Sequence, residues 1–179
     1  SGKHNPSGRL TASFPVTEGQ IPVHYNFFST GRPAVGIQRF EAKYNDCQIE
    51  PLYPFGYGKS YTEFLYEDIK LSSDKMAEDG VIDISFTVRN TGKHDGYEIV
   101  QLYVRDLVAS RVRPVKELKG FKKVFVKAGE SKRETISLKA KELAFCHTDM
   151  TFFVEKGDFK LWVAKNALDN SNEFDFRVV

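Results

Sequence analysis

Regular alternation of apolar and polar residues, which begins near residue 61, limits most strongly what this chain can fold into. In the clearest stretch, polar residues separate four apolar ones: Ile82, Ile84, Phe86 and Val88. Successive side chains of a β-strand point to opposite faces, so this pattern predicts a strand with one buried and one solvated face. Only residues 141–145 suggest a helical turn.

The same alternation recurs in short runs through the rest of the chain. We expect strands over residues 62–71, 97–105, 115–126, 133–138, 150–154, 159–164 and 174–178, with turns at Ala128-Gly129 and at residues 156–158. Many short strands at regular intervals are typical of a β-sandwich. We therefore predict a mainly β chain, with an antiparallel sandwich of the fibronectin type III or immunoglobulin type over residues 61–179.

Residues 1–60 differ in composition from the predicted sandwich. Proline and glycine recur through them, and only residues 10–16 suggest a short strand. A stretch of about 45 residues without regular elements is too long for an ordinary loop, and its aromatic residues make it too apolar for a free linker. We expect an extended, irregular N-terminal segment that lies across another surface.

Charge and side-chain spacing exclude several functions. The 26 basic and 24 acidic residues leave a net charge of +2, which is too even to indicate nucleic acid or a membrane surface as a partner. No apolar run is long enough to span a membrane. The histidines are scattered and follow no ligand spacing, so we expect no metal and no cofactor. They are His4, His24, His94 and His147.

The two cysteines, Cys47 and Cys146, follow no redox or metal spacing. A disulfide between them has no positive support, and two free thiols are the favoured interpretation. Free thiols favour a reducing compartment. They leave the localisation open between cytoplasm, periplasm and the outside of the cell.

Three motifs, in this order, resemble the C-terminal part of family 3 glycoside hydrolases, the β-glucosidases and β-xylosidases. They are Asn5-Pro-Ser-Gly-Arg-Leu10, Tyr53-Pro-Phe-Gly-Tyr-Gly-Lys-Ser-Tyr61 and Arg113-Pro-Val-Lys-Glu-Leu-Lys-Gly-Phe121. The resemblance implies three parts. Residues 1–18 would end an α/β-sandwich domain, residues 19–60 would form a connector, and residues 61–179 would form a fibronectin type III-like domain.

The resemblance also implies that this chain carries no catalytic residue. Family 3 enzymes place the nucleophilic aspartate on a (β/α)8 barrel, which takes ~250 residues and exceeds this chain. Their acid/base glutamate lies upstream of the point that matches residue 1. Residues 40–46 are similar to a family segment with arginine where Lys43 stands, so Lys43 is a weak candidate for contact with a sugar.

We therefore expect a non-catalytic part of a larger retaining enzyme, whose partners are the upstream catalytic domains of the same protein. The isolated chain is expected to self-associate through uncovered apolar surface. The candidate interface residues are Tyr53, Phe55, Tyr57, Tyr61, Tyr97, Ile99 and Tyr103. The alternative is a stand-alone carbohydrate-binding module that stacks sugars on exposed aromatic rings, with Trp162 as a candidate.

Overall fold

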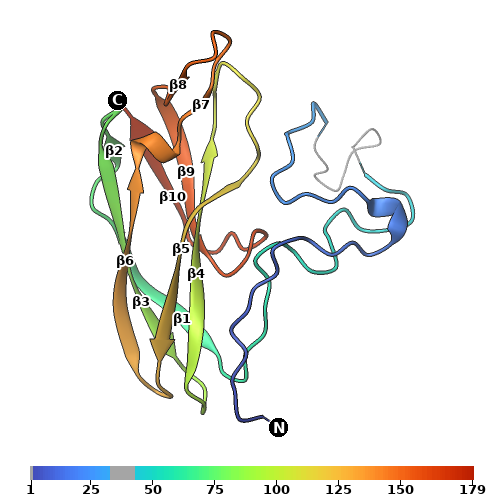
Figure 1. Cartoon of the computed structure of the whole chain (residues 1–179), viewed down its shortest axis with the longest axis vertical. Helices are drawn as coiled ribbons and strands as arrows, with labels where there is room; N and C mark the ends of the chain where they lie inside the picture. The colour runs from blue at the N-terminus through green and yellow to red at the C-terminus, as the bar shows by residue number, and fades with distance from the viewer. Residues whose placement is uncertain (1, 33–42) are drawn as a thin grey trace.

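The computed structural model describes residues 2–32 and 43–179, and it shows a two-layered β-sandwich with the N-terminal segment on one side (Figure 1). The strands are β1 (Phe64–Leu71), β2 (Lys75–Met76), β3 (Val81–Asn90), β4 (Gly96–Asp106), β5 (Glu117–Val126), β6 (Ser131–Lys139), β7 (Phe145–Cys146), β8 (Phe152–Phe153), β9 (Gly157–Ala164) and β10 (Glu173–Val178). Two single-turn 3-10 helices, η1 (Glu18–Gln20) and η2 (Ala140–Glu142), complete the described elements.

The two layers are a three-stranded sheet, β1-β3-β6, and a five-stranded sheet, β2-β10-β9-β4-β5. All pairings are antiparallel except the short parallel pair of β2 with β10. The strands β7 and β8 form a separate two-stranded hairpin. The register of the β4–β5 pair shifts between Leu102 and Tyr103, so that Lys119, next to Gly120, has no partner on β4.

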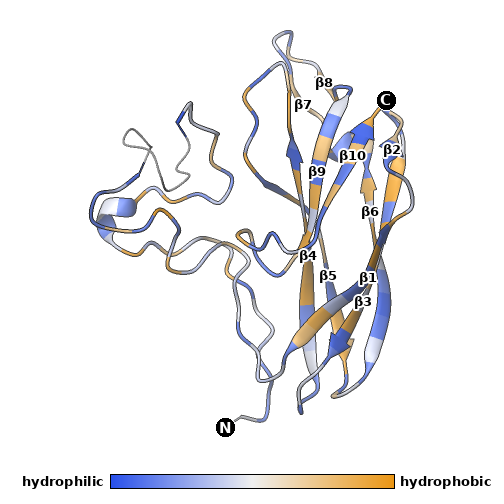
Figure 2. Ribbon diagram, turned by 180° about the vertical axis from the view of Figure 1, so that it is seen from behind, coloured by the Kyte–Doolittle hydropathy of each residue, from blue (hydrophilic) through white to orange (hydrophobic). Residues whose placement is uncertain are grey.

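The core lies between the two sheets, where the inward faces meet. The alternation read from the sequence is confirmed in β3, whose four alternating apolar residues are fully buried. The inward residues of β4 join them: Val100, Leu102 and Val104. In Figure 2 apolar and polar residues alternate along these strands, as expected for sheets with one buried face.

The mainly β, sandwich-type fold is confirmed, but two local predictions are wrong. Residues 10–16 form no strand, because their only ladder contact is a single bridge between Phe14 and Tyr53. Residues 156–158 are not a turn between two paired strands. Gly157 and Asp158 begin β9, which pairs with β10 and β4, while β8 pairs with β7.

The N-terminal segment runs along the five-stranded sheet and then stands away from it (Figure 1). Its two arms, residues 2–16 and 53–61, lie side by side through backbone hydrogen bonds. Leu10 N donates to Tyr57 O at 2.8 Å, and Gly56 N donates to Leu10 O at 2.8 Å. The two arms of the segment are therefore joined to each other by hydrogen bonds, in addition to their contacts with the sandwich.

Candidate domain-docking surface

The outer face of the five-stranded sheet holds the N-terminal segment through an aromatic cluster. Tyr103 on β4 and Trp162 on β9 are buried there. Phe55 and Tyr25 of the segment pack on them, with their own rings stacked at a centroid distance of 4.1 Å. Tyr103 meets Tyr25 edge to face at 6.1 Å. Stacked and edge-to-face pairs stabilise beyond their buried area, by about 0.5–1.5 kcal/mol each, so this cluster anchors the segment.

Gly56 lies against the sheet because a glutamine on β4 binds its carbonyl. Gln101 Nε2 donates to Gly56 O at 3.0 Å, and Tyr103 Oη donates to Gln101 Oε1 at 2.6 Å. Burial, and secondarily Tyr25, raises the pKa of the Tyr103 phenol, which keeps it a donor. Gly56 has φ +80, and a Cβ there would lie 2.0 Å from Gln101 Oε1. Glycine is therefore required by both the backbone angle and the close approach.

The loop after β9 completes the receptor for Phe55. Ala167 N donates to Phe55 O at 3.0 Å. Lys116 holds this loop in place through three hydrogen bonds. Its Nζ donates to Ala167 O at 3.1 Å, Asp169 O at 3.0 Å and Asn170 Oδ1 at 2.8 Å.

The Lys116 ammonium also lies 4.5 Å from the centre of the Trp162 ring. Burial lowers its pKa to about 8, against the opposing effect of Asp169 and Glu173. Because all three donors of the ammonium have acceptors, this buried charge is satisfied.

A second attachment joins residues 2–16 to the sandwich through a buried ion pair. Arg9 Nη2 lies 2.7 Å from Glu98 Oε2, and the side chains are only 11% and 3% exposed. Tyr66 Oη donates to the other oxygen of Glu98 at 2.6 Å. Burial, and then the charge of Glu98, raises the pKa of Tyr66. Arg9 and Glu98 border a cavity of 340 Å³ that Lys165 also lines.

Asn5 ties the ends of the two arms to the start of β4. Its Oδ1 accepts from Ser60 Oγ at 2.8 Å and from Tyr61 N at 2.9 Å, while its Nδ2 donates to Asp95 O at 2.9 Å. Farther along the segment, the buried Gln20 accepts from Val16 N and donates to the carbonyls of Gln48, Ile49 and Glu50. The segment is therefore irregular but held by specific hydrogen bonds.

Much of the surface of the N-terminal segment is apolar and exposed. Phe14 and Tyr53 lie edge to face at 6.4 Å, and Tyr53 stacks on Tyr57 at 5.1 Å. Together with Leu10 and Gly58, they line an open groove of 530 Å³. The large exposed apolar side chains of the segment are Phe14, Val16, Ile21, Phe27, Phe28, Tyr44, Ile49, Leu52 and Tyr53. We call this surface the connector patch.

The structure brings together some of the predicted interface residues and separates others. Phe55 and Tyr103 meet in the aromatic cluster, and Tyr53 and Tyr57 line the groove. Tyr61 is exposed beside Asn5.

The two predicted residues at the start of β4 lie outside the aromatic cluster. Tyr97 is 38% exposed, with Phe125 at 5.0 Å and the Lys123 ammonium 4.6 Å from its ring centre. Ile99 is half-buried opposite Lys123.

The two candidates for sugar contact lie in different surroundings. Lys43 is exposed at the edge of the described residues, and the rest of its motif, residues 40–42, lies outside them. Trp162 is buried, its indole N–H donates to Glu173 Oε2 at 2.9 Å, and Lys116 lies over its ring. A ring so covered offers no face to a sugar, which argues against the role suggested for Trp162.

Sequence reasoning missed the polar residues that hold the segment. Gln101 and Lys116 stand in strand patterns as isolated polar residues, and Arg9, Gln20 and Glu98 look like ordinary surface residues. The one available signal was Gln101, which interrupts an apolar face of β4 between Ile99 and Tyr103. A polar residue in such a position is buried when it has a specific partner.

Within residues 2–32 and 43–179, no three metal-ligating side chains gather into a possible site. Both cysteines are free thiols, as favoured from the sequence. The described helices include none that is long and apolar enough to cross a membrane.

Comparisons with known proteins agree with the motifs. A family model described as a fibronectin type III-like domain matches residues 98–167. The periplasmic β-glucosidase of Salmonella typhimurium is 43% identical over 168 residues, which cover 93% of this chain and 22% of that protein. The thermostable β-glucosidase B of Acetivibrio thermocellus is 40% identical over 177 residues, covering 94% of this chain and 23% of that protein.

The solved structures lead to the same family. The β-glucosidase of Listeria innocua in complex with isofagomine aligns with a TM-score of 0.94 and 39% identity, over 99% of this chain and 25% of that one. The chain thus spans about a quarter, or less, of the length of these relatives. It belongs to the C-terminal part of the family 3 glycoside hydrolases and carries their fibronectin type III-like domain.

Proposed function

We propose that this chain is the non-catalytic brace of a larger β-glucosidase-like enzyme, in which it holds the upstream catalytic domains to the sandwich. The whole protein would hydrolyse terminal β-linked sugars with retention. The observation that carries the proposal is the N-terminal segment itself. The segment docks on the sandwich through Phe55 and Gly56, and it also presents the exposed connector patch.

The exposed connector patch indicates that a large partner with an apolar surface binds there. Exposed apolar patches beyond a few hundred Å² are uncommon on soluble monomers and mark interaction sites. The partner that fits is the polypeptide that precedes this region in the longer relatives, since residues 2–16 already belong to the segment and form one wall of the groove. The partly exposed residues Tyr97 and Ile99 on β4 would extend the same contact.

Retaining hydrolysis requires two carboxyl groups about 5–5.5 Å apart across the scissile bond. The buried carboxylate of this chain that lies in a cavity, Glu98, is held by Arg9 and Tyr66. Both of its oxygens are therefore engaged in holding the N-terminal segment and β1 to β4. We therefore assign the chemistry to the upstream domains.

The test is hydrolysis of an aryl β-glucoside by two proteins. The purified chain should match buffer, whereas the whole protein with its upstream domains should turn over substrate. Activity of the isolated chain that disappears on substitution of one acidic residue would overturn the proposal. Binding of glucan oligomers by the isolated chain would favour the carbohydrate-binding alternative.

A further inference from the structure

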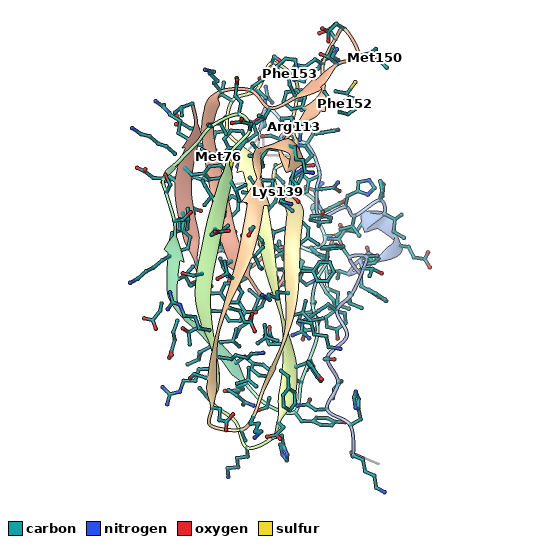
Figure 3. All side chains as sticks on the ribbon, turned by 60° about the vertical axis from the view of Figure 1, so that its left-hand side comes forward. Met76, Arg113, Lys139, Met150, Phe152 and Phe153 are labelled. Carbon is teal, nitrogen blue, oxygen red and sulfur yellow. The ribbon has the colours of Figure 1, made fainter. Side chains whose placement is uncertain are left out.

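A second exposed apolar surface lies at the end of the sandwich opposite the N-terminus (Figure 1). It combines the loop between β4 and β5 with the β7–β8 hairpin. Its five residues are between 49% and 80% exposed: Val108, Val112, Met150, Phe152 and Phe153. We call it the apical patch. Figure 3 shows Met150, Phe152 and Phe153 at this end, with Arg113 beneath them.

The apical patch is built on a rigid base. The His147 ring lies between the rings of Phe153 and Phe145, at 3.5 and 4.2 Å. The Arg113 guanidinium lies 4.4 Å from the centre of the Phe145 ring. These contacts fix the hairpin on the sandwich.

The two loops of the patch are also joined to each other. Ser110 N donates to Glu155 Oε2 at 2.8 Å, which links the β4–β5 loop to the hairpin. Surfaces ordered in advance lose less entropy on binding, so such a base suits a docking surface.

The apical patch is continuous with the connector patch through the loop between β4 and β5. Val115 N donates to Phe27 O at 2.9 Å, and Phe28 forms a bridge with Pro114. Phe27 and Phe28 are themselves more than half exposed. The loop swings out on the side of the sandwich where the N-terminal segment stands (Figure 1), so a partner seated on the segment lies next to the patch.

The missing polypeptide is large enough to reach both patches. The 168 matched residues are 22% of the Salmonella relative, so roughly 590 residues of that protein lie outside the match, and a compact body of that size has a radius of gyration of about 25 Å. The 11-residue strand β4 is about 36 Å long at 3.3 Å per residue. A compact sphere with this radius of gyration is about 65 Å across, so one body of that size can contact the sandwich along its whole length.

From this continuity and size we infer that the apical patch is a second contact with the upstream polypeptide of the same protein, which would then hold the sandwich at two places. The surface it fits is an apolar hollow with an acidic side chain near the exposed Arg111. The inference rests on the proposed function. A contact within one chain benefits from a high effective concentration, so this second contact holds even if it is weak by itself.

Hydrogen exchange on the whole protein and on the isolated chain tests the inference. We expect amides of residues 108–112 and 148–153 to exchange at least about tenfold more slowly in the whole protein, since each 1.4 kcal/mol of added protection slows exchange tenfold. The variant Phe152→Ser should restore fast exchange at the apical patch, and Val81→Ser, an exposed apolar residue outside it, should not. Both variants should melt like the wild type as isolated chains, because both side chains are exposed.

Other patterns of protection would overturn the inference, and they distinguish its failure from a failure of the proposed function. Protection of the connector patch without protection of the apical patch overturns this inference and leaves the proposed function standing. Protection of neither overturns both. Protection of the apical patch that appears only with rising protein concentration, together with the mass of a dimer, means that a second copy covers it and overturns the inference.

Discussion

Gly56 shows how one residue decides whether the N-terminal segment can dock. Its φ of +80 and the closeness of Gln101 Oε1 leave no room for a side chain. Gly129 has a similar φ of +75, but a Cβ there would meet nothing within 4 Å. A side chain at Gly129 would cause backbone strain alone, whereas a side chain at Gly56 would cause backbone strain and a steric clash. Comparing substitutions at the two glycines therefore distinguishes the two effects.

We predict that Gly56→Ala lowers the free energy of unfolding by more than about 2 kcal/mol, whereas Gly129→Ala costs about 1 kcal/mol from strain alone. Urea denaturation followed by the fluorescence of the single Trp162 measures both, because Trp162 lies in the cluster that Phe55 completes. Equal losses in the two variants would show that Gly56 is not sterically excluded by the sheet.

The lowered pKa of Lys116 makes the free energy of unfolding depend on pH, and the sign of this dependence can be worked out. Its pKa in the folded chain is about 8, below the ordinary 10.5. Between these values the unfolded chain binds more protons, so the contribution of Lys116 to stability rises as pH rises from 8 toward 10.5.

The variant Lys116→Met should therefore remove part of the increase in unfolding free energy between pH 8 and pH 10. Lys127→Met, at an exposed position in the turn after β5, should retain it. Denaturant titrations at a series of pH values give the comparison. Parallel curves for wild type and Lys116→Met would contradict the lowered pKa.

At the scale of elements, the irregular arms are ordered by partners on β1, β4 and the loop after β9. Arg9 reaches Glu98 on β4, Glu98 reaches Tyr66 on β1, and Lys165 Nζ donates to Phe64 O at 2.7 Å. These side-chain contacts with the sheets add to the backbone hydrogen bonds that join the two arms. This arrangement concentrates the stability of the arm in a few buried polar contacts.

Removing one of these contacts should lower the free energy of unfolding substantially. We predict that Glu98→Ala destabilises the chain by about 3–5 kcal/mol, because it leaves a buried guanidinium without its counter-charge. The matched control is Arg177→Ala, which breaks the exposed pair with Asp158 and should cost less than about 1 kcal/mol. Thermal melting of the two variants tests the difference, and a small loss for Glu98→Ala would mean that water reaches the pair.

For the whole molecule, the balance between covered and uncovered apolar surface determines behaviour in solution. The sandwich has a closed core, but the connector patch has no cover among the described residues of this chain. We expect the isolated chain to self-associate, with an apparent mass by light scattering that rises with concentration. Phe14→Ser, in the apolar groove, should reduce the rise, and a strict monomer at high concentration would contradict the expectation.

The alternation of apolar and polar residues in β3 and β4 was enough to predict the sandwich, because strands with one apolar face are stabilised when that face is buried between two sheets. The sequence also indicated the family, through three motifs whose glycines, prolines and aromatics suit only particular backbone shapes. The failed strand over residues 10–16 shows the limit of periodicity, since pairing there depends on Tyr53 and Tyr57, about forty residues away.

The way in which the segment is held, and the choice of aromatic side chains that it covers, depend on tertiary packing and could not be predicted from the sequence. Trp162 and Tyr97 look alike in sequence, yet Trp162 is buried under Lys116 and Tyr97 is partly exposed beside Phe125. The difference arises because burial of a strand's outer face depends on which distant segment lies across it. That choice depends on long-range hydrogen bonds such as the one from Gln101 to Gly56, which leave no periodic trace in the sequence.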